Sequence, residues 1–203
     1  MGKESRTPEV NATEYRCIIG GLRYLVHTRP DLAFAVGFLS QFMEKPHEEH
    51  LAAVKRVLRY VAGTRGYGLR YVQREDQALK LIGYSDADLA GDIDQLKSTS
   101  GIVFFLGNNP ITWQSSKQKV MALSSCEEEY NPAASASCQG VSHIDTSYHF
   151  IRECIDGNRI VIGHTSTEKQ LADMLTKALG RVHFQELRAE IGVDDILSDS
   201  VKA

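Results

Sequence analysis

A group of acidic residues in the middle of the chain has the chemistry of a divalent metal site. The segment Tyr84-Ser-Asp86-Ala-Asp88-Leu-Ala-Gly-Asp92 follows an apolar run at 79–82, which predicts a strand with Asp86 near its end. A carboxylate held rigidly at a strand end suits Mg²⁺, because this ion prefers hard oxygen ligands in strict octahedral geometry. Short acidic pairs are also common in solvated turns, so the spacing alone leaves both interpretations open.

The composition is that of an ordinary globular chain. Its 203 residues are 42% hydrophobic and 24% charged, which is enough to bury one good core or two small ones. The net charge of −3 does not by itself indicate nucleic-acid binding. Residues 1–80, however, carry 13 basic and 9 acidic side chains, whereas residues 81–203 carry 10 and 17. This asymmetry suits a phosphate-contacting surface beside a metal site, and it suits an ordinary surface equally.

The cysteines and the apolar runs bear on the cellular compartment. Cys17, Cys126, Cys138 and Cys154 show no Cys-x-x-Cys or Cys/His ligand spacing, so we expect buried or inert thiols of an intracellular protein. No apolar run has the length of a membrane span, and residues 1–11 are polar and unlike a signal peptide. We therefore expect a cytoplasmic or nuclear protein without a membrane partner.

Prolines and glycines divide the first third of the chain into predicted helices. Apolar residues at helical spacing predict helices over 14–27, 31–46 and 47–62, which follow a disordered lead over 1–12 and form a segment at 13–65. The outer face of the third helix carries Lys55, Arg56 and Arg59. These side chains could contact nucleic-acid phosphates, and a plain solvated face explains them equally well.

From Gly68 the apolar period changes from that of a helix to that of a strand. Alternation predicts a meander with strands at 69–71, 79–82, 99–106 and 111–113 and turns at 73–77 and 108–110. Later segments predict helices at 133–138, 143–155, 168–179 and 184–191, with a strand at 159–162. We expect this α+β domain to span 66–195, with Trp113 in its core and a tail at 196–203.

Longer motifs run through the whole chain. In the helical part they are Tyr15-Arg-x-Ile-Ile-Gly20-Gly-Leu-x-Tyr24-Leu, Thr28-Arg-Pro-Asp31, His50 and Arg56-x-Leu58-Arg-Tyr60-x-x-Gly63-Thr64. In the α+β part they are Tyr84-Ser-Asp-Ala-Asp88-x-Ala-Gly91, Lys97-Ser-Thr-Ser-Gly101, Ile111-Thr-Trp113-x-Ser115, Lys117-Gln118, Ala122-Leu-Ser-Ser125-x-Glu127-x-Glu129-Tyr130, His143-Ile-Asp145, Tyr148-His-Phe150-Ile-Arg152-Glu153 and Gln170-Leu-Ala-Asp173-x-x-Thr176-Lys177. In this order they resemble the connection segment and the ribonuclease H domain of copia-type retrotransposon Pol polyproteins.

The resemblance implies a fold and a chemistry. The fold is a ribonuclease H-like α+β or α/β mixed sheet with flanking helices, and the chemistry is two-metal cleavage of the RNA strand of an RNA–DNA hybrid. The resemblance makes Asp86, Glu129 and Asp173 catalytic residues and ligands of Mg²⁺ or Mn²⁺. His164 precedes the Gln170–Asp173 segment by a loop and could contact nucleic acid and assist product release near the metals. Glu129 can instead be a helix-start charge, Asp173 a surface acid and His164 a solvated loop residue.

One carboxylate of the family is missing from this chain. In the family it lies in an Asp-Asn pair on a strand before the His-Ile-Asp helix, and no Asp-Asn pair occurs in this sequence. Here Cys138-Gln-Gly-Val-Ser runs straight into His143, which implies an internal deletion between about 140 and 143 that removes a central strand. We expect the strand at 159–162 to pair directly with the strand of Asp86 instead. Neither Asp145 nor Glu128 is expected to replace the missing ligand.

The missing strand leaves three hypotheses for function. The first is endonucleolytic cleavage of RNA–DNA hybrids, weakened or lost in this copy. The alternative is a catalytically inactive, domesticated remnant that acts as a nucleic-acid-binding or protein-interaction module. A further hypothesis is assembly, because a sheet edge exposed by the deletion could pair with a second copy or another protein.

Overall fold

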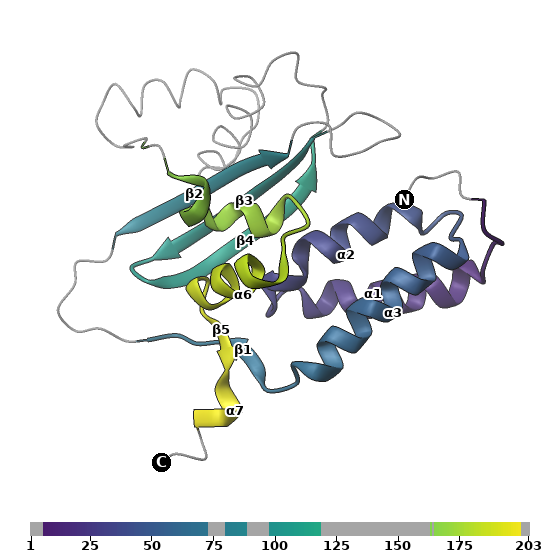
Figure 1. The fold of residues 1–203 in the computed structure, drawn as a ribbon, viewed down its shortest axis with the longest axis horizontal. Coiled ribbons are helices and arrows are strands. Elements are labelled where there is room, and N and C mark those ends of the chain that lie inside the picture. Colours follow the sequence, from purple (N-terminus) through teal and green to yellow (C-terminus); the bar gives the residue numbers. More distant parts are fainter. Residues whose placement is uncertain (1–5, 73–79, 89–97, 119–162, 164, 200–203) are drawn as a thin grey trace.

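A helical part and a sheet part make up the computed structural model (Figure 1), which describes residues 6–72, 80–88, 98–118, 163 and 165–199. The helical part contains, with η for 3-10 helices, α1 (Ala12–Leu25), η1 (Pro30–Leu32), α2 (Ala33–Leu39), η2 (Ser40–Phe42) and α3 (Glu48–Gly63). The other elements are β1 (Tyr67–Leu69), β2 (Leu81–Asp88), β3 (Thr99–Leu106), β4 (Asn109–Lys117), η4 (Thr167–Lys169), η5 (Leu171–Leu175), α6 (Arg181–Glu190), β5 (Val193–Asp195) and α7 (Ile196–Asp199).

The first helix forms because it has an N-terminal cap and because its apolar residues lie at helical spacing. The Asn11 side chain accepts hydrogen bonds from the backbone N–H groups of Thr13 (3.0 Å) and Glu14 (3.3 Å), which caps α1. Tyr15, Ile19 and Leu22 are buried at intervals of four and three residues. Cys17 is exposed on this helix, so of the expected buried or inert thiols, this one is not buried. The second predicted helix is shorter than expected, because η1 and η2 flank a brief α2.

The lead before α1 is partly ordered, contrary to the prediction of disorder over 1–12. The Val10 N–H donates to the Pro46 carbonyl and the Glu48 N–H donates to the Pro8 carbonyl, each at 3.0 Å. These bonds surround an isolated antiparallel bridge between Glu9 and His47. The lead pairs with the residues just before and at the start of α3. Such a long-range contact has no periodic pattern in the sequence, so it could not be predicted.

The described strands form two separate antiparallel sheets. One has the order β2-β3-β4, and the other pairs β1 with β5. The predicted hairpin between the strands near 69–71 and 79–82 is therefore wrong. The Arg70 N–H donates to the Gly192 carbonyl and the Ile196 N–H donates to the Gly66 carbonyl, both at 2.9 Å, so these bonds hold β1 on β5. Gly192, at φ 90°, makes the turn after α6 that brings β5 back.

The β3–β4 hairpin turns earlier than predicted. Gly107 adopts φ 63°, and Asn109 and Pro110 already belong to β4, which runs on to Lys117. The prediction of a short strand at 111–113 preceded by a turn at 108–110 is corrected accordingly. Pro110 is tolerated because the register shifts between Phe104 and Phe105 opposite it.

Two apolar cores hold the described residues together. One lies between α1, α2 and α3 and includes Tyr15, Val36 and Val54. The other joins one face of the three-stranded sheet to η5 and α6, through residues such as Val103 and Leu175. Trp113 packs against this second core, and its indole N–H donates to the Val26 carbonyl at 2.9 Å, so the predicted packing role is confirmed. The mixed α+β architecture agrees with the predicted fold class.

The elements predicted near the C-terminus lie where expected, but one of them has a different type of helix. The expected helix at 168–179 is a pair of short 3-10 helices, and the helix predicted at 184–191 is α6. The expected tail at 196–203 begins with α7. The predicted strand at 159–162, the helices at 133–138 and 143–155 and the deletion point lie outside the described residues. In the part of the chain that the structure describes, no helix has the length and apolar character needed to cross a membrane.

Candidate active site

Asp86 lies inside a strand. β2 ends at Asp88, so the prediction that Asp86 lies near the end of a strand is confirmed, although the strand runs beyond the predicted bound of 82; Asp86 pairs with Gly101 of β3. Strand alternation places Asp86 on the same face as Tyr84, whose ring packs edge-on against core residue Phe105 at 5.8 Å. Its side chain is 20% exposed. The carboxylate therefore has a fixed backbone and a solvent-accessible tip.

The segment that carries Asp173 is fastened directly to the strand of Asp86. The Gln170 Nε2 donates to the Ser85 carbonyl at 3.0 Å, and its Oε1 accepts the Ala172 N–H at 3.3 Å. Leu171 and Leu175 are buried in the core on the same turn. These contacts place η5 over β2 and β3, where Figure 1 shows it in green across the sheet.

Gly101 allows η5 to approach this closely. A Cβ at position 101 would lie 2.7 Å from the Thr176 Cγ2 and 2.8 Å from both the Ala172 carbonyl oxygen and the Leu175 Cβ. These distances are shorter than any real Cβ contact, and one partner is backbone. The glycine of the Lys97-Ser-Thr-Ser-Gly101 motif thus has a packing role, because it brings the Asp173 turn down onto Asp86.

Gly101→Ala is expected to lower the free energy of unfolding by about 1–3 kcal/mol, because overpacking forces η5 away from the sheet. Gly20→Ala is the matched control, since nothing lies within 4 Å of a Cβ at that position in α1. The control should stabilise the protein by about 0.5–1 kcal/mol, because alanine suits a helix interior better than glycine. Urea unfolding of both variants checks the contrast, and equal effects would contradict the role assigned to Gly101.

The two aspartates meet around one hydroxyl and one ammonium group. The Thr176 Oγ1 donates to the Asp86 Oδ2 at 2.5 Å. The Lys177 Nζ lies 2.9 Å from the Asp173 Oδ2 and 3.7 Å from the Asp86 Oδ2. The Asp173 side chain is only 2% exposed, so the interpretation of Asp173 as a surface acid is wrong. Lys177 supplies the positive charge that a buried carboxylate needs.

Burial and neighbouring charges shift the proton equilibria here. Burial raises the pKa of Asp173, and the negative charge of Asp86 adds to that rise against the hydrogen bond from Lys177. For Lys177, burial acts to lower the pKa, but the hydrogen bond to Asp173 and the charges of both aspartates outweigh it, so the pKa rises. Burial also raises the pKa of Asp88, to which the charge of Asp86 contributes.

Sequence reasoning gave no role of their own to three residues of this site, although Asp88 belongs to the acidic group singled out at the start. Asp88 follows Asp86 by two positions on one strand, so alternation alone would have placed both carboxylates on one face. Thr176 and Lys177 follow Asp173 by three and four positions, which is one helical turn. The motif that carries them was recognised, but only its aspartate was assigned a role.

Asp88→Asn is expected to stabilise the metal-free protein at neutral pH and to have no effect near pH 3. Because the pKa of Asp88 is higher in the folded state, the native protein holds this proton more tightly, and the resulting stability is lost as pH rises. Asparagine does not ionise, so the advantage of the variant should grow between about pH 3 and 6 and then level off. Urea unfolding of both proteins in EDTA across this range measures it, and a pH-independent difference would contradict it.

The remaining predicted site residues are not part of this cluster. Glu129 and His164 lie outside the described residues. Lys55, Arg56 and Arg59 are all exposed on α3, and Figure 1 shows that helix well apart from β2.

A buried polar network joins the helical part to α6. Arg29 pairs with Asp31 through Nε–Oδ1 (2.9 Å) and Nη2–Oδ2 (2.7 Å) bonds, and it also donates to the Thr64 carbonyl and hydroxyl. The Tyr60 hydroxyl donates to the Asp31 Oδ2 at 2.7 Å and accepts from the Arg188 Nη1 at 3.1 Å. Burial and the charge of Asp31 raise the pKa of Tyr60. The Thr28–Asp31 and Tyr60–Thr64 motifs therefore have structural roles.

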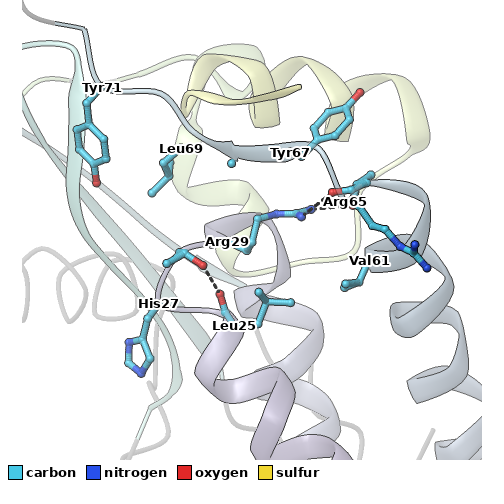
Figure 2. A pocket seen from close by; sticks show the side chains of 11 residues that line it. Leu25, His27, Arg29, Val61, Arg65, Tyr67, Leu69 and Tyr71 are labelled. Atoms are coloured by element: carbon cyan, nitrogen blue, oxygen red, sulfur yellow. Dashed lines mark hydrogen bonds between the residues drawn. The ribbon is translucent and has the colours of Figure 1, made fainter. Parts of the chain in front are cut away.

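A cavity of about 460 Å³ lies beside this network (Figure 2). Figure 2 shows Arg29 at its centre, with Leu69 and Val61 on either side and Tyr71 at one edge. The lining comes from the ends of α1 and α3 and from β1, and it includes none of the acidic residues described above. The cavity is therefore separate from the carboxylate cluster.

Several known proteins are similar to this chain. The retrovirus-related Pol polyprotein from transposon RE1 of Arabidopsis thaliana is 41% identical over 228 residues, which cover 93% of this chain. The one from transposon TNT 1-94 of Nicotiana tabacum is 37% identical over 218 residues, or 88% of this chain. Secreted RxLR effector protein 161 of Plasmopara viticola is 48% identical over 128 residues, which are 63% of this chain and 89% of that protein. No family profile and no solved structure matches this chain.

The alignments also give the extent of the likeness. The chain spans about 15% of the RE1 polyprotein and 16% of the TNT 1-94 polyprotein. The RE1 alignment is 228 residues long but takes in only 93% of the 203 residues here, or about 189, so about 39 aligned positions have no counterpart in this chain. The position of the deletion, between about 140 and 143, stays a prediction. The identities of about 40% over nine-tenths of its length show that this chain belongs to the copia-type, retrovirus-related Pol polyproteins of transposons.

Proposed function

We propose that this chain is a ribonuclease H-type module that binds RNA–DNA hybrids and cleaves their RNA strand slowly. The observation that carries the proposal is the meeting of Asp86 on β2 with Asp173 beneath Lys177, from segments far apart in the sequence. The resemblance assigns metal-binding roles to these same two residues, and membership of the Pol family supports that assignment. Glu129, the third carboxylate assigned this role, lies outside the described residues.

The donors present fit a hard divalent cation. Asp86 and Asp173 offer carboxylate oxygens, the ligand type that Mg²⁺ and Mn²⁺ prefer, and other residues of the protein hold both side chains in place. Thr176 fixes the rotamer of Asp86, and Gln170 fixes the Asp173 turn on β2. Among the described residues, no three His, Cys, Asp or Glu side chains gather into a metal site, so Glu129 or water is needed to complete one.

The bound metal would activate a water molecule and stabilise the charge that develops on the scissile phosphate. We propose a slow rate because the sequence lacks the Asp-Asn pair that supplies one ligand in the family. Loss of one member of a catalytic unit typically raises the barrier by several kcal/mol, and each ~1.4 kcal/mol is a factor of ten in rate.

Cleavage of an RNA–DNA hybrid with the RNA strand end-labelled tests the proposal. The assay uses single-turnover conditions with Mg²⁺ or Mn²⁺, and its controls are EDTA and the same hybrid labelled on DNA. We expect slow, metal-dependent cuts in RNA alone. Cuts that persist in EDTA or that fall in both strands equally would point to a contaminating nuclease and count against the proposal.

A second function, a binding module without catalysis, is favoured by two observations. The Asp-Asn pair is missing, and Lys55, Arg56 and Arg59 form an exposed basic group on α3. A relative covered for 89% of its length is named as an effector, which supports a role outside a full polyprotein. Hybrid binding by fluorescence anisotropy, without any cleavage, would select this function. A triple charge-neutralising variant of α3 should then weaken binding and flatten its salt dependence.

A further inference from the structure

The Lys177 ammonium lies where a cation shared by the two aspartates would lie. Its Nζ is 2.9 Å from the Asp173 Oδ2 and 3.7 Å from the Asp86 Oδ2. The side chain of Asp173 is 2% exposed, whereas that of Lys177 is 34% exposed. A partly exposed side chain thus reaches the buried carboxylate, so Lys177 lies between Asp173 and the solvent.

The backbone of the turn holds Lys177 in this place. The Lys177 N–H and the Thr176 N–H both donate to the Asp173 carbonyl at 3.2 Å, which fixes the two residues beside the aspartate. The Thr176 hydroxyl also contacts the Asp86 carboxylate and the Asp173 backbone carbonyl, so it links the turn to the strand of Asp86. The lysine stem remains flexible, because four methylene groups separate the ammonium from this fixed backbone.

We propose that Lys177 is a built-in competitor of the divalent cation, whose ammonium must leave Asp173 before a metal ion binds there. The Lys177 Nζ, 2.9 Å from the Asp173 Oδ2, occupies the solvent-side position from which a divalent ion would approach this oxygen. The repulsion between the two positive charges is strong where water is scarce, so the two cations compete for that position. The inference rests on the proposed metal site, since it concerns the same two aspartates. The measured metal affinity is then the intrinsic affinity multiplied by the fraction of molecules in which Lys177 is displaced, and this fraction is small.

Titration of the full chain with MnCl₂, followed by calorimetry and by the electron paramagnetic resonance signal of free Mn²⁺, tests this without measuring activity. We expect Lys177→Met to bind Mn²⁺ at least about tenfold more tightly than wild type, because the methionine stem fills the same space without charge. Lys177→Arg keeps the competing cation and should bind as weakly as wild type. Lys169→Met is the control for loss of one positive charge, because Lys169 is an exposed residue on η4. The titrations are run at pH 8, where protons compete least for the carboxylates.

The outcomes separate this inference from the metal site itself. Equal Mn²⁺ affinity in wild type and Lys177→Met, with binding lost in Asp86→Asn, would overturn the competitor role and leave the metal site standing. An equal gain in Lys169→Met would also overturn it, because the effect would then be one of net charge. Absence of Mn²⁺ binding in every variant would overturn the inference and the proposed site together. Thermal unfolding confirms that each variant is folded, and Lys177→Gln replaces Lys177→Met if the latter is not.

Discussion

Asp86→Asn is expected to reduce metal-dependent cleavage of an RNA–DNA hybrid about a thousandfold or to background, the equivalent of about 4 kcal/mol of barrier. Asp86 is fixed by the β2–β3 ladder and by the hydroxyl of Thr176, so the amide should keep the same place. An amide lacks the charge that a hard divalent cation requires, and the reaction depends on that cation. The fold should be nearly unchanged, which isolates the chemistry.

Single-turnover rates in Mn²⁺ for wild type and variant measure this effect. The matched control is Asp194→Asn, the same substitution on β5 opposite Gly68, in the sheet that lacks the carboxylate cluster. The control should cleave as wild type does. Unchanged cleavage in Asp86→Asn would show that the activity does not pass through this site, whatever the metal dependence of the wild type.

Asp31→Asn is expected to lower the free energy of unfolding by about 3–5 kcal/mol, because it leaves the Arg29 guanidinium buried without a counter-charge. Both side chains of this pair are at most 5% exposed. Asp31 also accepts from the Tyr60 hydroxyl, so the substitution weakens the link between α3 and α6 through Arg188. Urea-induced unfolding followed by circular dichroism measures the loss.

An exposed ion pair provides the comparison for this prediction. Lys45 and Glu9 lie 2.9 Å apart, and their side chains are 64% and 60% exposed. Glu9→Gln should leave stability unchanged within error, because solvent screens such a pair. Comparable losses in the two variants would mean that the burial of Arg29 and Asp31 does not decide their contribution.

The sequence predicted the elements whose formation depends on their own residues alone. The apolar spacing of Tyr15, Ile19 and Leu22 indicated α1, and alternation indicated β3, because each follows from the period of one element. Asp86 and Asp173 could be singled out because their motifs are long and specific. The predicted role of both as metal ligands remains a prediction.

The features that the sequence did not reveal depend on contacts between distant segments. The pairing of β1 with β5 joins residues 67–69 to residues 193–195, and no local signal marks such a partner. The turn at Leu171–Leu175 is a 3-10 helix because Gln170 binds Ser85 and Ala172 sits on Gly101, so tertiary contacts override the helical pattern. Lys177 was not assigned to the site for the same reason, because one of its partners, Asp86, lies on β2.

The β1–β5 pairing also sets an order of events during synthesis. β1 leaves the ribosome about 125 residues before its partner strand, a delay of about 6–25 s at about 5–20 residues per second. During that interval the three helices can pack, but β1 remains a single unpaired strand at the end of α3. A nascent or proteolysed chain that stops before Val193 would expose that strand, together with the core positions of Leu187 and Ile191. The β5 strand, Val193–Asp195, therefore completes the β1–β5 sheet late in synthesis.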